Sequence, residues 1–152
     1  GKINLVIDEL TDSLKNLDAA SEARNLDLPA EFPLVLSAGR HTDKTMNTLM
    51  RNPEWNKGKR ACTIAVHPDL AQRLGLADGA QVRVTTQAGS AEGELEVSDQ
   101  VRYGTVLIPH GFGLIYDGKT YGINVNHLPS HTHRDPIGTP LHRFVPCRLE
   151  EC

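Results

Sequence analysis

The amino-acid sequence predicts a mainly β domain with a few short helices, an α+β chain built around a closed barrel. Short apolar runs bounded by glycine and proline recur from residue 33 onward, as is typical of strands joined by tight turns. Residues 80–97 alternate apolar and polar side chains, which is the pattern of a β-hairpin with one buried face. Helical spacing is confined to short stretches that do not alternate regularly with strands, so a barrel is favoured over a parallel nucleotide-binding sheet.

Each strand is expected from its own apolar run. In addition to the hairpin, strands are expected at residues 34–38, 62–66, 105–109 and 144–149. These runs are rich in Val, Ile and Leu, side chains that pack well on a pleated sheet.

Two short helices are expected. Leu10, Leu14 and Leu17 are spaced by four and three residues, which places them on one face of an amphipathic helix. A second helix should begin near Pro68, which is tolerated in the first helical turn, and should end at Gly75.

The segment between the first helix and the first strand is expected to be a connector. Residues 18–32 are polar, and Pro29 and Pro33 lie at its end. We therefore expect residues 1–31 to be a helix stub and linker from a preceding domain, with a poorly packed leucine face, and residues 32–152 to form the barrel domain.

Composition narrows the class of protein. The chain has 152 residues, 39% hydrophobic and 23% charged, which fits one globular domain. A net charge of -3 argues against a general nucleic-acid binder. No apolar run is long enough to insert into a membrane, and the first residues lack the pattern of a signal peptide. Three widely spaced cysteines favour a reducing compartment, so we expect a cytoplasmic protein, or a periplasmic one if its parent carries an upstream signal.

The first candidate loop runs from Gly39 to Thr48, directly after the first expected strand. Gly39 lets backbone N–H groups approach a ligand, and Arg40 and Lys44 can pair with phosphate. The spacing is not that of a P-loop. The alternative is a solvated surface loop, which often has the same composition.

The second candidate loop, residues 109–113, follows an apolar strand. Its two glycines allow close packing against a planar ligand, and His110 offers a ring nitrogen for hydrogen bonding or proton exchange. The alternative is a turn that needs glycine conformations.

The third candidate loop spans residues 124–140. Amide side chains can read the edge of a heterocycle through paired donors and acceptors, and an aspartate can do so for a guanine-like N–H pair. The alternative is an irregular loop held together by Asn and Asp turn hydrogen bonds.

Four histidines lie in or near this third loop, and histidine is a common zinc ligand. They are His127, His131, His133 and His142. Their spacing matches no standard ligand set, and we expect no metal site. No Ser-His-Asp or Cys-His arrangement is recognisable, and no catalytic residue is predicted.

The order and spacing of the motifs together resemble the molydopterin dinucleotide-binding, C-terminal domain of the dimethyl sulfoxide reductase superfamily of molybdenum and tungsten oxidoreductases. The resemblance covers residues 32–152. It rests on AGRH at 38–41, NT at 47–48, VHPDLA at 66–71, LGLADG at 74–79, VRV at 82–84, GTV at 104–106, PHG at 109–111, NVNHL at 124–128 and DPIGTP at 135–140.

This resemblance implies a double-psi β-barrel whose loops bind a molybdopterin guanine dinucleotide cofactor, with the molybdenum or tungsten carried by the full enzyme. The first, second and third loops match the cofactor loops of the family. With the phosphate-pairing residues above, the expected cofactor-binding residues are Gly39, Arg40, His41, Thr42, Lys44, Asn47, Thr48, His110, Gly111, Asn126, Arg134 and Asp135.

The resemblance also implies a role limited to binding and orienting the cofactor in a parent of the formate dehydrogenase or nitrate reductase type. Family enzymes place their metal ligand and their iron-sulfur segment in other domains, so this chain alone is not expected to be catalytic. Its expected partners are the remaining domains of the parent oxidoreductase. The alternatives are a stand-alone double-psi barrel enzyme or recognition module, and a histidine-rich metal-binding module.

Overall fold

The structure is a computed structural model. The structure describes residues 3, 6–39, 49–52, 54, 60, 62–132, 134–135 and 138–152. The helices are α1 (Asp8–Lys15), α2 (Ala19–Asn25) and α3 (Pro68–Leu74), with 3-10 turns η1 (Leu49–Arg51) and η3 (Val125–His127). The strands are β1 (Leu34–Gly39), β2 (Ile64–Val66), β3 (Gln81–Thr86), β4 (Ser90–Val97), β5 (Thr105–Pro109), β6 (Ile115–Tyr116), β7 (Lys119–Thr120) and β8 (Val145–Glu151).

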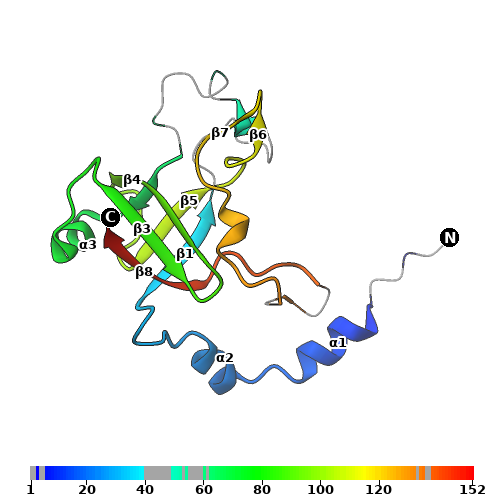
Figure 1. Cartoon of the computed structure of the whole chain (residues 1–152). Coiled ribbons are helices and arrows are strands. Elements are labelled where there is room, and N and C mark those ends of the chain that lie inside the picture. Colours follow the sequence, from blue (N-terminus) through cyan, green and yellow to red (C-terminus); the bar gives the residue numbers. More distant parts are fainter. Residues whose placement is uncertain are drawn as a thin grey trace.

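Six of these strands close into a barrel in the order β1-β5-β2-β4-β3-β8 (Figure 1). Two neighbouring pairs are parallel, β1 with β5 and β2 with β4, and the other pairs are antiparallel. Closure gives the barrel strands partners on both sides. The predicted mainly β fold of the double-psi barrel class is therefore confirmed.

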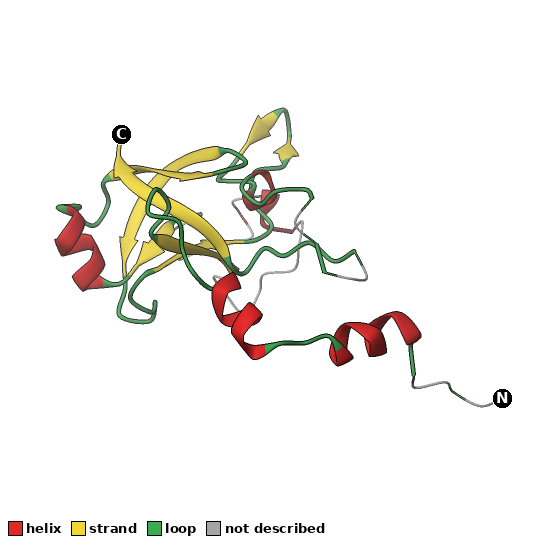
Figure 2. Ribbon diagram, turned by 90° about the horizontal axis from the view of Figure 1, so that it is seen from below, coloured by secondary structure: helices red, strands yellow, loops and turns green. Residues whose placement is uncertain are grey.

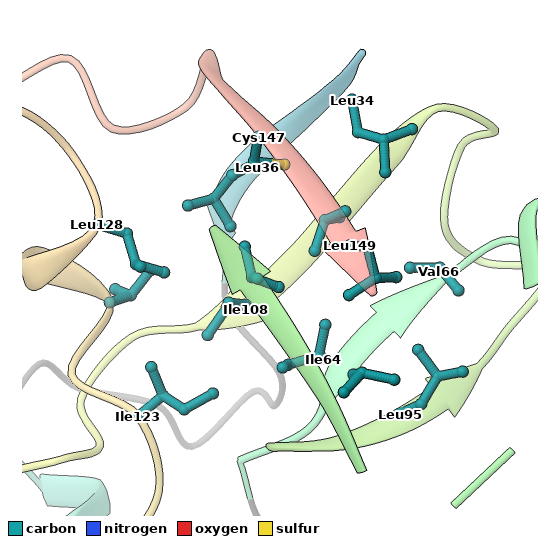
Figure 3. Close-up of a cluster of buried hydrophobic side chains, with 14 of the residues drawn as sticks. Leu34, Leu36, Ile64, Val66, Leu95, Ile108, Ile123, Leu128, Cys147 and Leu149 are labelled. Carbon is teal, nitrogen blue, oxygen red and sulfur yellow. The ribbon is translucent and has the colours of Figure 1, made fainter. Parts of the chain in front are cut away.

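The barrel is filled by alternate side chains of its strands. Val82 and Val84 of β3 are fully buried, whereas Arg83 between them is half-exposed, as the predicted hairpin pattern requires. Figure 3 shows the apolar side chains of several strands converging on one cluster. Cys147 of β8 belongs to this core, whereas Cys152, after β8, is exposed.

Helix α3 begins and ends as predicted. The His67 ring nitrogen Nδ1 accepts a hydrogen bond of 3.1 Å from the Asp69 N–H and so caps the helix start. Gly75 ends the helix with a φ of 69°, a left-handed conformation that favours glycine. Both views place α3 at the end of the barrel opposite the β6–β7 hairpin (Figures 1 and 2).

The N-terminal arm, residues 6–28, extends away from the barrel (Figure 2). The predicted helix α1 is present but ends at Lys15, so Leu17 lies beyond it. Leu14 and Leu17 are 71% and 64% exposed, so these leucines are poorly packed, as expected. Among the described residues, no helix has the length and apolar character needed to cross a membrane.

The expected connector at residues 18–32 contains helix α2, which was not predicted from the sequence. The Asp18 carboxylate accepts a hydrogen bond of 2.8 Å from the Ser21 N–H and caps the helix start. The following AASEARN segment holds three alanines, the strongest helix formers. Pro29 lies beyond the last turn and does not interrupt it.

The short hairpin of β6 and β7 was not predicted from the sequence. Its turn residues Asp117 and Gly118 have φ values of 49° and 71°, which is the geometry that an Asp-Gly pair favours in a two-residue hairpin. Tyr116 tethers it, because its hydroxyl accepts a hydrogen bond of 3.3 Å from the Asn52 amide.

A pair of leucine substitutions tests the division between barrel and arm. Leu95→Ala should lower the free energy of unfolding by about 2–5 kcal/mol, because it leaves a cavity in a fully buried site. Leu14→Ala removes the same atoms from a side chain that is 71% exposed. It should change the free energy of unfolding by less than about 0.5 kcal/mol. Urea denaturation measures both, and similar losses would contradict the arrangement described.

Candidate functional site

The candidate site begins where β1 and β5 end side by side. The parallel register pairs Gly39 with Pro109, and the His110 N–H donates a hydrogen bond of 2.9 Å to the Gly39 carbonyl. A Cβ atom at residue 39 would lie 2.4 Å from the Leu107 Cδ1 atom, so a larger residue here would have to displace the end of the Leu107 side chain. The first and second loops therefore leave the barrel at the same point.

Most of the first predicted loop lies outside the part of the chain that the structure describes. Arg40, His41, Thr42, Lys44, Asn47 and Thr48 lie outside the described residues. Gly39, the first predicted residue of that loop, is the one that the structure brings to the site.

The second and third loops line one hollow of about 230 Å³. It is lined by His110, Gly111, Phe112, Leu114, Asn124, Val125 and Asn126. Three of the residues predicted from the sequence, His110, Gly111 and Asn126, are thus brought together here. The lining offers an imidazole, amide side chains and backbone groups, which can hydrogen-bond to heterocycle edges or phosphate oxygens.

A close backbone contact joins the second loop to the start of the third. Gly113 has a φ of 73°, and its N–H donates a hydrogen bond of 2.7 Å to the Tyr121 carbonyl. A Cβ atom at residue 113 would lie 2.1 Å from the Asn124 backbone nitrogen. Only glycine allows the two loops to approach this closely.

Asn124 fixes the backbone at the start of the η3 turn, which lines the hollow. Its side-chain oxygen accepts a hydrogen bond of 3.2 Å from the Asn126 N–H, which caps the η3 turn. Asn126 itself is exposed on the side of the hollow.

Arg134 and Asp135 hold their own loop together. The Arg134 guanidinium donates hydrogen bonds of 2.8 Å to the carbonyls of His131 and Gly138, and the Asp135 carboxylate accepts one of 2.7 Å from the Thr139 N–H. Neither residue lines the hollow, so the structure does not bring these two predicted residues to the others.

His142 is a neighbour of the site that was not among the predicted cofactor-binding residues. Its ring meets the His110 ring edge to face, with centroids 4.9 Å apart, and its carbonyl accepts a hydrogen bond of 3.0 Å from the Ala38 N–H. Sequence spacing gave no signal for this contact between residues 32 positions apart. Within the described part of the chain, no group of three His, Cys, Asp or Glu residues could hold a metal ion.

A larger hollow, of about 680 Å³, lies between α2 and residues 139–146. Its lining includes the exposed apolar side chains of Leu26 and Leu141. It contains neither the end of β5 nor the η3 turn. We place the candidate site in the smaller hollow, because the polar groups and the close glycine contacts converge there.

Alanine substitution of two glycines distinguishes the energetic cost of disturbing the contact between the loops from the cost of a left-handed backbone. Gly118→Ala, at a φ of 71° with open space around it, should cost about 1–2 kcal/mol of unfolding free energy from the left-handed conformation alone. Gly113→Ala, at a φ of 73°, adds the clash with Asn124 and should cost about 1–3 kcal/mol more. Equal losses in thermal or urea unfolding would show that the loops do not depend on this contact.

The sequence is similar to parts of larger proteins. The chain is 32% identical over 92 residues to acetylene hydratase of Syntrophotalea acetylenica, covering 60% of this chain and 13% of that protein. It is 28% identical over 87 residues to a Staphylococcus aureus (strain USA300) protein that carries the provisional name formate dehydrogenase, covering 57% of this chain and 9% of that protein.

A solved structure shares the fold. The acetylene hydratase structure from Pelobacter acetylenicus matches with a TM-score of 0.68 and 25% identity, over 80% of this chain and 19% of that chain. The chain thus spans a small part of the relatives it matches.

The family model described as "Molydopterin dinucleotide binding domain" matches residues 34–143. The matched range runs from the start of β1 to just before β8 and includes the described loops of the site. Because it covers more than half of the sequence, the chain belongs to the molydopterin dinucleotide binding domain family.

Proposed function

We propose that this chain binds and orients a molybdopterin guanine dinucleotide as the C-terminal domain of a larger molybdenum or tungsten oxidoreductase, of the formate dehydrogenase or nitrate reductase type. The observation that carries the proposal is the hollow at the shared end of β1 and β5, where His110, Gly111 and Asn126 converge.

The size of the hollow fits one part of such a ligand. Sites that enclose a drug-sized molecule have volumes of roughly 300–1,000 Å³, and this hollow has about 230 Å³. It can receive a ring or a phosphate group but not a whole dinucleotide. The chain would therefore supply one wall of a site that other domains of the parent complete.

The donor set also fits. Asn126 can present an amide edge to a heterocycle, and His110 can present a ring nitrogen. Gly39 and Gly111 allow backbone to lie close to a flat or anionic group. Arg40 and Lys44, predicted from the sequence, would add the charges that pair with pyrophosphate.

When bound, the cofactor supplies the redox-active metal centre, and the protein supplies binding, orientation and hydrogen bonds. The residues of this chain would fix the ligand against the barrel end and keep it from rotating. Arg134 and Asp135 would act by shaping the third loop through their internal hydrogen bonds.

The names of the relatives support a binding role for this domain. One relative is named for the hydration of acetylene and another for the dehydrogenation of formate. A domain shared by proteins with such different reactions is better suited to hold a common cofactor than to select a substrate. Substrate choice would then belong to the remaining domains of the parent, which are this chain's proposed partners.

Binding of GDP, as a stand-in for the nucleotide half of the cofactor, tests the proposal. Nuclear magnetic resonance shifts on adding GDP should cluster in residues 39–48, 109–113 and 124–140, and should shrink at high salt because exposed charge pairs are screened. Arg40→Ala should weaken binding by about tenfold, since a hydrogen bond to a charged group contributes about 1.5–3 kcal/mol.

A matched variant controls for the loss of charge. Arg24→Ala removes the same charge from the exposed helix α2 and should leave the shifts unchanged. Shifts confined to residues 62–79, or none at millimolar GDP and low salt, would overturn the proposal.

A further inference from the structure

Two buried side chains of the barrel hold the two ends of the segment that carries Asn126. We call residues 123–128 the clamped segment. Cys62, just before β2, contacts its first residue, and Thr86, at the end of β3, contacts its last. Neither Cys62 nor Thr86 lines the hollow.

The first anchor is the thiol of Cys62. The Ile123 N–H donates a hydrogen bond of 3.3 Å to the Cys62 Sγ atom, and the thiol donates a longer one, of 3.9 Å, to the Ile123 carbonyl. A Cβ atom at Gly122 would lie 2.4 Å from the Cys62 Cβ atom, so backbone and side chain meet closely. Burial raises the pKa of the Cys62 thiol to about 11, so the thiol keeps its proton at neutral pH.

The second anchor is the hydroxyl of Thr86, which is 4% exposed. Its Oγ1 atom accepts hydrogen bonds of 3.1 and 3.2 Å from the N–H groups of Ala88 and Gly89 in the hairpin turn. The Thr86 hydroxyl can donate its proton to the Leu128 carbonyl at 2.6 Å or to the Gly89 carbonyl at 3.2 Å, and the Leu128 carbonyl is the closer acceptor. A Cβ atom at Gly89 would lie 3.0 Å from the His127 carbonyl oxygen, so the turn packs directly against the clamped segment.

Between the anchors, burial fixes the direction of Asn126. Val125 and Leu128 are 2% and 0% exposed and pack in the core, whereas Asn126 faces the hollow. Figure 3 shows Ile123 and Leu128 on one side of the core cluster, so both ends of the segment reach the barrel interior. A loop that is already ordered in the free protein loses less conformational entropy when a ligand binds.

We propose that Cys62 and Thr86 are positioning residues that preform the clamped segment, and with it Asn126, for the ligand of this site. This inference rests on the proposed function for the identity of the ligand. The clamp itself is a property of the free protein and can be measured without any ligand.

Hydrogen exchange of the 152-residue chain, without ligand, tests the clamp. In the unaltered chain, the amides of Ile123 and Leu128 should exchange nearly as slowly as the barrel strands. Thr86→Val keeps the shape but removes the hydroxyl, and should speed exchange in the clamped segment by about tenfold. Thr86→Ser keeps the hydroxyl and should restore slow exchange. Thr85→Val, on the outward face of the same strand, should have no local effect.

The cysteine anchor has its own matched pair. Cys62→Ala should speed exchange in the clamped segment more than in the barrel strands. Cys147→Ala removes the other buried thiol from the core and should speed exchange across the barrel with no added effect on the clamped segment. Exchange of the barrel strands also reports whether each variant is folded.

Affinity for GDP then links the clamp to the site. Thr86→Val should weaken GDP binding several-fold with the same pattern of shifted residues, and Thr86→Ser should bind as the unaltered chain does. Exchange in the clamped segment as fast as in α1, or unchanged exchange and affinity in Thr86→Val, would overturn the inference. A lack of GDP binding by the unaltered chain would instead overturn the proposed function, while the exchange results would still decide the clamp.

Discussion

The parallel pairing of β1 with β5 is the constraint on which the rest of the site depends. Parallel strands end at the same edge, so the chain that follows Gly39 and the chain that follows Pro109 leave the barrel together. A slip of one residue in this register would turn the buried face of one of the two strands outward. The fully buried side chains of Leu36 and Ile108 oppose such a slip, and the register of the core therefore sets the position of the site.

The third loop joins this site by a different kind of interaction. Its backbone is held by side-chain hydrogen bonds, by close glycine contacts and by the burial of Val125 and Leu128. Such contacts need neighbours that come from distant parts of the sequence. The site is thus a composite, with strand pairing fixing two loops and side-chain packing adding the third to them. A rigid barrel that carries variable loops is a common way to place functional groups.

The strands were predictable because each is a local apolar run, and β5 was predicted with the bounds it has. Helix α2 and the β6–β7 hairpin were not predicted, although the Asp18 cap and the Asp117-Gly118 turn are local sequence signals for them.

Within the site, the convergence of His110, Gly111 and Asn126 followed from the family resemblance and not from their spacing. The contacts of His142 with His110 and of Thr86 with Leu128 depend on three-dimensional register, which no local pattern encodes.

The three thiols have a further consequence for spectroscopy. Cys62 and Cys147 are buried, whereas Cys152 is exposed and lies near α3, at the end of the barrel away from the loops (Figures 1 and 2). A maleimide dye or spin label should therefore attach selectively at Cys152, giving a reporter that needs no engineered cysteine and lies away from the candidate site.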